Sequence, residues 1–391
     1  MTRRGNGEGS IRKLKKGLWE GRYSVGKDEN DKLVRRAVYA SKKEVCEAKL
    51  KVAIEATKAQ SGLFVAADML TVDEWMKKYI WDIKKPNVKP MTFEDYERNW
   101  RLYIKPAKIS SMKILEVRKW HFREFVDELL AAGASPFTIR NVYGVLRNAF
   151  NTAEKRGIIP VSYANNVELP KRRAKPTVIL TQEQQKAFME AVKGHRMEAA
   201  FIIAATTGIR EGELAALMWE DYDGSNLSIT KDAVRVNIYD PETHEKTGSE
   251  VIIQDTPKTD AGVRSIPLMP IAKEALRVHK MAQNDEKVQN RELYKDNDKG
   301  LIFCNEVGLV YEPRYYRNLL HKLLDAAGLP RKKFHALRHT FATRGLEAGL
   351  SPKELQELMG HETPEMVMHY QHLLEKQART AIDKMAKYFE W

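Results

Sequence analysis

The feature of this sequence that most constrains its fold is an apolar segment of helix length, Met197–Thr206, near the middle of the chain. It reads MEAAFIIAAT and carries a single charge, whereas 30% of all residues in the chain are charged. A helix that is apolar on every side has to be covered by other elements. We therefore expect the second half of the chain to enclose this helix in a core.

Other parts of the chain show apolar residues at helical spacing. Intervals of three and four residues indicate amphipathic helices, and prolines and a glycine separate the runs. Thr71 is suited to be the N-cap of the first helix. Together the runs predict a four-helix bundle over about residues 71–160. The helices are expected at Val72–Trp81, Thr92–Tyr103, Arg118–Ala131 and Ser135–Arg156.

The N-terminal segment combines a strand pattern with a helix pattern. Apolar and polar residues alternate over Ser10–Val38, which favours a small three-stranded antiparallel sheet. Ser41 and Glu44 match a capping box for a helix over Val45–Gln60. The cationic sheet could lie in a DNA groove or could be a solvated basic surface, and the sequence leaves both readings open. Its cations are Arg12, Lys13, Lys15, Lys16, Arg22, Arg35 and Arg36.

The second half of the chain places strands between helices. A helix opens at Thr181, strand patterns follow over Leu227–Leu268, and helical patterns return from Ala272. Lys258 lies between two of the strand patterns, where we expect the tip of a β-hairpin. A lysine at such a tip can reach into a groove, although an ordinary solvated turn lysine fits the local sequence equally well.

A chain of 391 residues is long enough for two or three domains. We expect a multidomain, mainly α protein. Its parts are a small three-stranded sheet plus helix at residues 1–62, a helical bundle at 70–165, and a mostly helical domain with a small antiparallel sheet at 177–391. The basic, proline-punctuated stretch Glu168–Thr177 is the expected linker between the last two parts.

Charge and cysteine content narrow the class of protein. The 66 basic and 53 acidic residues give a net charge of +13. This charge suits a polyanionic partner, although a merely basic protein would also carry it. Cys46 and Cys304 fall in different predicted domains and support neither a disulfide framework nor a cysteine metal site. Because we find neither a signal peptide nor a membrane span of roughly 20 apolar residues, we expect a cytoplasmic protein without a membrane partner.

Three basic side chains are placed to hold an anion. Arg210 comes shortly after the predicted core helix and Gly208, at the edge of the core. The alternative to anion binding is an ion pair between Arg210 and Glu211 or Glu213. His335 and Arg338 lie one helical turn apart and project from one face. A guanidinium matches phosphate oxygens bidentately, and an imidazole can donate to the same group or carry a proton. A structural role in the core is the alternative for the histidine.

His361 and Tyr370 complete a pattern of candidate site residues along the chain. His361 follows a glycine that marks a helix end, and Tyr370 lies nine residues later in a short helical segment. A tyrosine taken alone is more often a core residue with a bonded hydroxyl. Their order along the chain, however, resembles the tyrosine recombinase (phage integrase) family over about Thr71–Trp391. The matching residues are Arg210, Lys258, His335, Arg338, His361 and Tyr370.

The resemblance implies a helical catalytic domain that breaks and rejoins DNA. Arg210 and Arg338 would hold the non-bridging oxygens of the scissile phosphate. Tyr370 would attack the phosphorus and form a 3′-phosphotyrosyl link, which stores the bond so that a 5′ hydroxyl can reverse the step without ATP. Such reversibility implies recombination, integrating or excising a mobile element or prophage.

The resemblance assigns the remaining proton and phosphate contacts as well. Lys258 would protonate the departing 5′ oxygen, His335 would assist proton transfer at the nucleophile, and His361 would bond the phosphate. No metal or nucleotide cofactor is implied.

The resemblance also implies partners. The helical bundle would bind the core-type site on double-stranded DNA, and the N-terminal module resembles the arm-type DNA-binding domain of integrases from lambda-like phages and conjugative transposons. Exchange of four strands implies a homotetramer on DNA, with the tail after Leu374 as a candidate for packing onto a neighbour. Accessory DNA-bending and excision proteins are possible further partners.

Three other classes of protein fit parts of the pattern. A metal-dependent hydrolase could use the histidines of the C-terminal half, but Arg338 lies between His335 and His339 and would repel a cation. A DNA-binding regulator would not need Tyr370. A type IB topoisomerase would share the tyrosine, arginines and lysine but would need neither a defined site nor a partner duplex.

Overall fold

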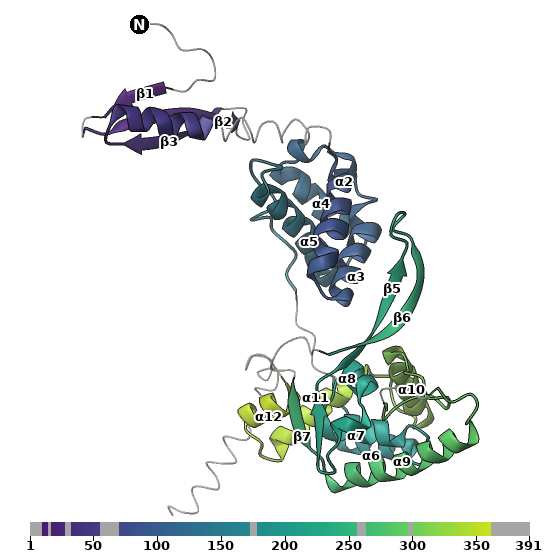
Figure 1. The fold of residues 1–391 in the computed structure, drawn as a ribbon. Helices are drawn as coiled ribbons and strands as arrows, with labels where there is room; N and C mark the ends of the chain where they lie inside the picture. The colour runs from purple at the N-terminus through teal and green to yellow at the C-terminus, as the bar shows by residue number, and fades with distance from the viewer. Residues whose placement is uncertain are drawn as a thin grey trace, which may run out of the picture. The chain divides into compact units, whose positions relative to one another are not determined.

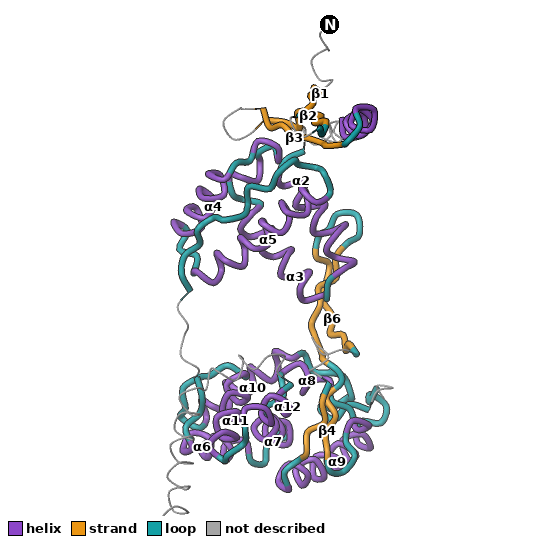
Figure 2. The backbone as a smooth tube through the Cα atoms, turned by 90° about the vertical axis from the view of Figure 1, so that its left-hand side faces the viewer, coloured by secondary structure: helices purple, strands orange, loops and turns teal. Residues whose placement is uncertain are grey.

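The computed structural model describes residues 10–14, 17–27, 33–54, 70–172, 178–255, 263–295 and 300–360. The chain divides into two compact units, Met1–Ala174 and Lys175–Trp391 (Figure 1). Helices make up most of the described chain, and the strands form small antiparallel sheets (Figure 2). The mainly α, multidomain class predicted from the sequence is confirmed. None of the helices in the described ranges has the length and apolar character needed to cross a membrane.

The N-terminal module of the first unit is a three-stranded sheet with a helix on one face. The strands β1 (Ser10–Lys13), β2 (Trp19–Lys27) and β3 (Leu33–Ala40) are antiparallel in the order β1-β2-β3. Residues 43–54 are helical, whereas an N-cap at Ser41 would make residue 42 the first helical residue. The helix packs closely because Gly21 of β2 has no side chain. A Cβ there would lie 3.3 Å from Leu50.

The opposite face of this sheet carries part of the predicted cationic surface. Cross-strand register places Arg12, Glu20 and Tyr39 side by side. Arg12 pairs with Glu20 at 2.5 Å, and Arg22 pairs with the same carboxylate at 3.0 Å. Two of the predicted basic residues therefore already balance a buried acid, and Arg35 on this face is exposed.

The four predicted helices of the first unit are present. Thr71 caps the first helix and forms a capping box with Glu74. The indole of Trp75 donates to the carbonyl of Ala149 at 3.0 Å, which ties the first helix to the last. The elements are α2 (Val72–Lys78), the π-helix η1 (Tyr79–Lys84), η2 (Lys85–Asn87), α3 (Pro90–Asn99), the π-helix η3 (Trp100–Ile104), η4 (Lys108–Ser111), η5 (Ile114–Glu116), α4 (Lys119–Ala131) and α5 (Pro136–Lys155).

The second unit encloses the apolar helix expected from the sequence. This helix is α7 (Glu198–Thr207), and its residues from Ala199 to Ala204 are at most 5% exposed. Phe201 of this helix and Phe334 belong to the same core cluster. The other helices are α6 (Gln182–Val192), which Thr181 caps, α8 (Glu211–Ala216), η6 (Trp219–Asp221), α9 (Pro270–Gln289), α10 (Pro313–Ala326), α11 (His335–Glu347) and α12 (Pro352–Met359).

The strands of the second unit pair differently from the sequence-based expectation. The strand β5 (Asp232–Tyr239) pairs with β6 (Lys246–Gln254), and β4 (Asn226–Ile229) pairs with β7 (Arg264–Pro267). The segment that follows β6 therefore leads to a strand of another sheet. The described residues of β6 and β7 therefore do not pair with each other as a hairpin would require, because local strand patterns do not determine which strands pair. Lys258, predicted at the tip of that hairpin, lies outside the described residues.

Candidate active site

Arg210 stands at the sharp turn between α7 and α8. Gly208 ends α7 in a left-handed conformation, with φ 64°, which a glycine adopts without strain. Arg210 then forms the N-cap of α8. Its backbone N–H donates to Glu213 Oε2 at 2.9 Å, and its Nη1 donates to Glu213 Oε1 at 2.6 Å. The ion pair considered for this arginine therefore exists and involves Glu213, whereas Glu211 pairs with Arg317 at 3.1 Å.

Arg338 reaches the same turn from α11. Its side chain is fully buried, with 1% of the residue exposed. Nη1 donates to the carbonyl of Gly208 at 2.7 Å, and Nη2 donates to the carbonyl of Met359 at 2.6 Å. Leu337 and Leu346 of the same helix are also buried. The two arginines, 128 positions apart in the sequence, meet at one turn and at the end of α12.

His335 lies in the first turn of α11 beside these arginines. Its ring centroid is 4.6 Å from that of His339, and the two rings are perpendicular. Partial burial, together with His339 and the positive charges of Arg338 and Arg210, lowers the pKa of His335 to about 4. The imidazole is therefore neutral near pH 7 and can accept a proton.

A buried ion pair between Glu213 and Arg264 holds Arg210 in place, and the sequence did not indicate Arg264. Glu213 is 2% exposed and accepts from Arg210 and also from Arg264 of β7, at 2.8 Å from Arg264 Nη2. Burial acts to raise the pKa of Glu213, but Arg264 and Arg210 outweigh it and hold this pKa at about 2. The spacing of Glu213 three residues after Arg210 is a local signal, whereas no local signal marks Arg264.

The other predicted site residues lie outside the described residues. Lys258 belongs to residues 256–262, and His361 and Tyr370 belong to residues 361–391. Gly360, the residue before His361, is described and accepts from Arg210 Nη2 at 3.0 Å. Their roles remain predictions.

The described part of the site is built to hold an anion. It combines one buried and one partly exposed guanidinium with a neutral imidazole, and the planar fork of a guanidinium matches two oxygens of a phosphate. Within the described ranges, no cluster of three or more histidine, cysteine or acidic side chains has a geometry suited to a metal ion. Arg338 beside His335 would itself repel a cation.

Comparison with known proteins identifies the family. The sequence model described as "Phage integrase family" matches residues 179–377, which include all of the predicted catalytic positions. The chain belongs to the phage integrase family. A second model of this family, the N-terminal SAM-like domain, matches residues 71–130.

Relatives that cover most of the chain agree with this assignment. A tyrosine recombinase XerC-like protein of Caldanaerobacter subterraneus subsp. tengcongensis is 30% identical over 376 residues, covering 94% of this chain and 95% of the relative. The transposase from transposon Tn916 of Enterococcus faecalis is 25% identical and covers 85% of this chain and 81% of the relative. This phage integrase family member is thus a tyrosine-type site-specific recombinase.

Solved structures show the same fold. The Tn1549 transposon integrase in complex with transposon right end DNA has a TM-score of 0.64 and 26% identity, and the match covers 81% of this chain and 100% of that chain. A lambda integrase tetramer bound to a Holliday junction is similar in fold, with a TM-score of 0.57 at 15% identity, over 94% of this chain and 96% of that chain.

Proposed function

We propose that this recombinase cleaves and rejoins double-stranded DNA through a 3′-phosphotyrosine formed on Tyr370. The observation that carries the proposal is the meeting of Arg210 and Arg338 at the Gly208 turn, beside a neutral His335. Two guanidiniums from distant parts of the chain can neutralise the charge that develops on a phosphate during attack. Membership of the phage integrase family supplies the reaction class.

The proposed reaction balances without an external reagent. The Tyr370 oxygen forms a bond to phosphorus as the bond from phosphorus to the 5′ oxygen breaks. His335 takes the phenolic proton directly or through water, and Lys258 donates a proton to the departing 5′ oxygen. Arg210, Arg338 and His361 bond the phosphate oxygens. A 5′ hydroxyl from a partner duplex then attacks the phosphotyrosine and restores the phosphodiester, so that neither a metal nor a nucleotide is consumed.

We extend the proposal to the DNA partners and the assembly. Residues 70–165 would bind the core-type site, residues 177–391 would carry the chemistry, and residues 1–62 would bind an arm-type site through the exposed face of the β1-β2-β3 sheet. Strand exchange would use a homotetramer on DNA, with accessory DNA-bending and excision proteins. Relatives from transposons and phages support integration or excision of a mobile element in a bacterial cytoplasm.

The decisive experiment traps the covalent intermediate. The full chain is incubated, without metal, with a nicked suicide duplex that carries a candidate attachment site, and the denatured mixture is examined for a protein–DNA adduct. We expect an adduct that peptide mapping places on Tyr370. Tyr370→Phe abolishes the adduct and leaves duplex binding measurable, because only the attacking oxygen is lost.

Tyr388→Phe, at the next tyrosine along the chain, is the matched control and should form the adduct at the wild-type rate. An adduct retained by Tyr370→Phe would refute the nucleophile assignment. Binding without any adduct on all attachment sequences would favour a DNA-binding regulator, and relaxation of supercoils without a defined site would favour a topoisomerase.

A further inference from the structure

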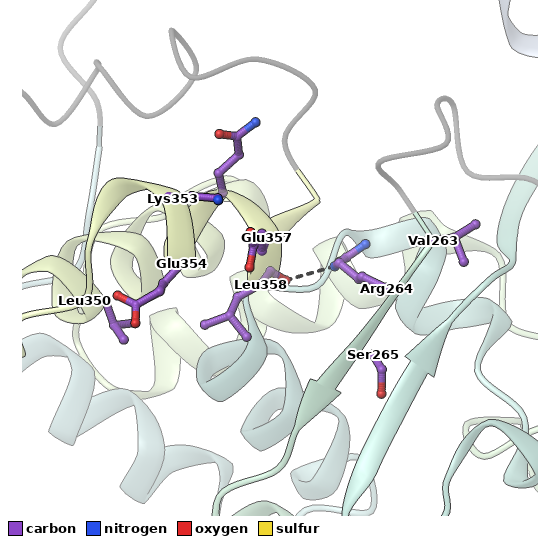
Figure 3. Close-up of a pocket in the computed structure, with 9 residues that line it drawn as sticks. Val263, Arg264, Ser265, Leu350, Lys353, Glu354, Glu357 and Leu358 are labelled. Atoms are coloured by element: carbon purple, nitrogen blue, oxygen red, sulfur yellow. Dashed lines mark hydrogen bonds between the residues drawn. The ribbon is translucent and has the colours of Figure 1, made fainter.

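Three arginines donate to three successive backbone carbonyls at the C-terminal end of α12. Arg264 Nε donates to Leu358 at 2.9 Å, Arg338 Nη2 to Met359 at 2.6 Å, and Arg210 Nη2 to Gly360 at 3.0 Å. Figure 3 shows Arg264 of β7 reaching Leu358 of α12. The last carbonyls of a helix lack partners within the helix and carry its partial negative charge, so they attract cations.

Arg264 differs from the other two arginines in its surroundings. Only 4% of its side chain is exposed, and both of its terminal nitrogens donate to a carboxylate, whereas those of Arg338 donate to backbone carbonyls. Arg264 Nη1 and Nη2 donate to both oxygens of Glu213, at 3.2 and 2.8 Å, and the same carboxylate holds the side chain and backbone of Arg210. Arg264 therefore joins β7, α8 and α12 through a single planar group.

We propose that Arg264 is a positioning residue for the recombination reaction, acting through Glu213 to orient the Arg210 guanidinium against the end of α12. The inference rests on the proposed function, because Arg210 is taken to hold the scissile phosphate. With Arg264 in place, Glu213 is restrained from two sides and Arg210 retains one orientation. Without it, the carboxylate can turn toward Arg210 alone, and the end of α12 loses one of its three bonds.

The pocket beside Arg264 should allow this side chain to be substituted without unfolding the protein. Arg264 lines a surface pocket of about 660 Å³ between β7 and α12, together with Val263, Ser265 and Leu358. Water can therefore fill the space of a shortened side chain and solvate Glu213. The expected consequence of substitution is a displaced Arg210 in a folded protein.

The experiment compares Arg264→Gln and Arg264→Lys with wild type in the full chain. The matched control is Arg196→Lys, since Arg196 forms a two-pronged pair with Glu286 in the same unit, at 2.5 and 2.6 Å, away from this cluster. Thermal melting first verifies that each variant folds, and Arg264→Lys serves if Arg264→Gln does not. Amide hydrogen exchange of the peptide over residues 352–360 then reports release of α12, with no need for DNA.

The kinetic measurement is the rate of adduct formation on the suicide duplex at saturating protein. A misplaced reacting group can cost on the order of 100-fold in rate, so we expect Arg264→Gln to be about 100-fold slower, with duplex affinity within about threefold of wild type. Arg264→Lys should be about 10-fold slower, because an ammonium cannot bond both Glu213 and Leu358 in the same fixed geometry. Arg196→Lys should match wild type.

A double-mutant cycle separates positioning from a general structural effect. If Arg264 acts through Arg210, Arg210→Lys combined with Arg264→Gln should be hardly slower than Arg210→Lys alone. Three outcomes would each overturn the inference and leave the proposed function intact. They are rate losses that multiply in the double mutant, unchanged hydrogen exchange in the α12 peptide, and a wild-type rate for Arg264→Gln. A wild-type chain that forms no adduct would overturn both.

Discussion

At the scale of single residues, the site depends on one buried carboxylate shared by two cations. Glu213 is surrounded by protein, yet its ionised form is favoured because Arg264 and Arg210 both bond it. A buried charge that loses its partner is costly, whereas the complete pair costs little. Glu213 therefore stabilises the fold by compensating the positive charges of Arg264 and Arg210.

This arrangement predicts a pH-dependent loss of stability in Glu213→Gln. The amide leaves a buried guanidinium without its counter-ion, so the free energy of unfolding should fall by about 3 kcal/mol near pH 7. The pKa of Glu213 is about 2 in the folded chain against an ordinary value of 4.5. The stabilisation is thus complete above pH 4.5 and is lost as the pH falls from 4.5 toward 2.

Chemical denaturation at several pH values measures this difference. Glu220→Gln is the matched control, because Glu220 is 69% exposed and pairs with Lys231 at the surface. Its substitution should change stability by less than about 1 kcal/mol. A Glu213→Gln chain as stable as wild type at pH 7 would contradict the account.

At the scale of secondary-structure elements, the site is assembled where α7, α8, α11 and α12 end or begin. Gly208 ends α7 and offers its carbonyl to Arg338. A Cβ at Gly208 would lie 2.6 Å from Cδ1 of Phe341 on α11. Gly212 in α8 is similarly close to β5, since a Cβ there would lie 2.8 Å from the carbonyl of Ala233. Glycines thus allow the helices that carry the arginines to approach their neighbours.

Gly208→Ala is expected to affect stability and chemistry together. The left-handed conformation costs a non-glycine residue roughly 1 kcal/mol or more, and the contact with Phe341 adds about 1–2 kcal/mol of overpacking. The displaced turn also moves the carbonyl that Arg338 bonds, so adduct formation should slow. Thermal denaturation and the suicide-duplex assay measure the two effects.

Gly328→Ala is the control for the backbone cost alone. Gly328 has φ 66°, close to that of Gly208, and a Cβ there would meet nothing within 4 Å. The Gly328→Ala variant should lose roughly 1 kcal/mol of unfolding free energy and should form the adduct at the wild-type rate. Equal losses in the two variants would show that packing against Phe341 is unimportant.

At the scale of the whole molecule, the chain consists of units that each bury a core of their own. The core of the second unit surrounds α7, and aromatic residues of the first unit, including Phe122 and Phe150, pack edge to face with ring centroids 4.9 Å apart. Units with separate cores commonly fold independently. Under the proposed function both units bind DNA, and two linked binding parts gain affinity from their connection.

We therefore predict that fragments 1–174 and 175–391 each unfold cooperatively when produced alone. Each should bind duplex DNA more weakly than the full chain, and the affinity of each should fall as salt rises, because phosphate contacts release counter-ions. Circular dichroism melting and fluorescence anisotropy at several salt concentrations test these points. A fragment 175–391 without a cooperative transition would show that the units depend on each other.

Much of the fold was predictable because its signals are local. Thr71 and Thr181 cap the helices predicted to follow them, since a capping residue acts on the next three residues. The burial of α7 followed from its composition alone. The types of residue at the site were also visible, because a guanidinium or an imidazole keeps its chemistry wherever the fold places it.

The sequence by itself thus determined the helices, the mainly α class and the kind of chemistry available to this recombinase. Only the tertiary structure decided that β6 pairs with β5 and β7 with β4, and that Arg264 and Arg210 share Glu213. These contacts join residues up to 51 positions apart. Strand pairing and buried ion pairs of this kind depend on how whole elements pack, and no local pattern of residue types encodes that packing.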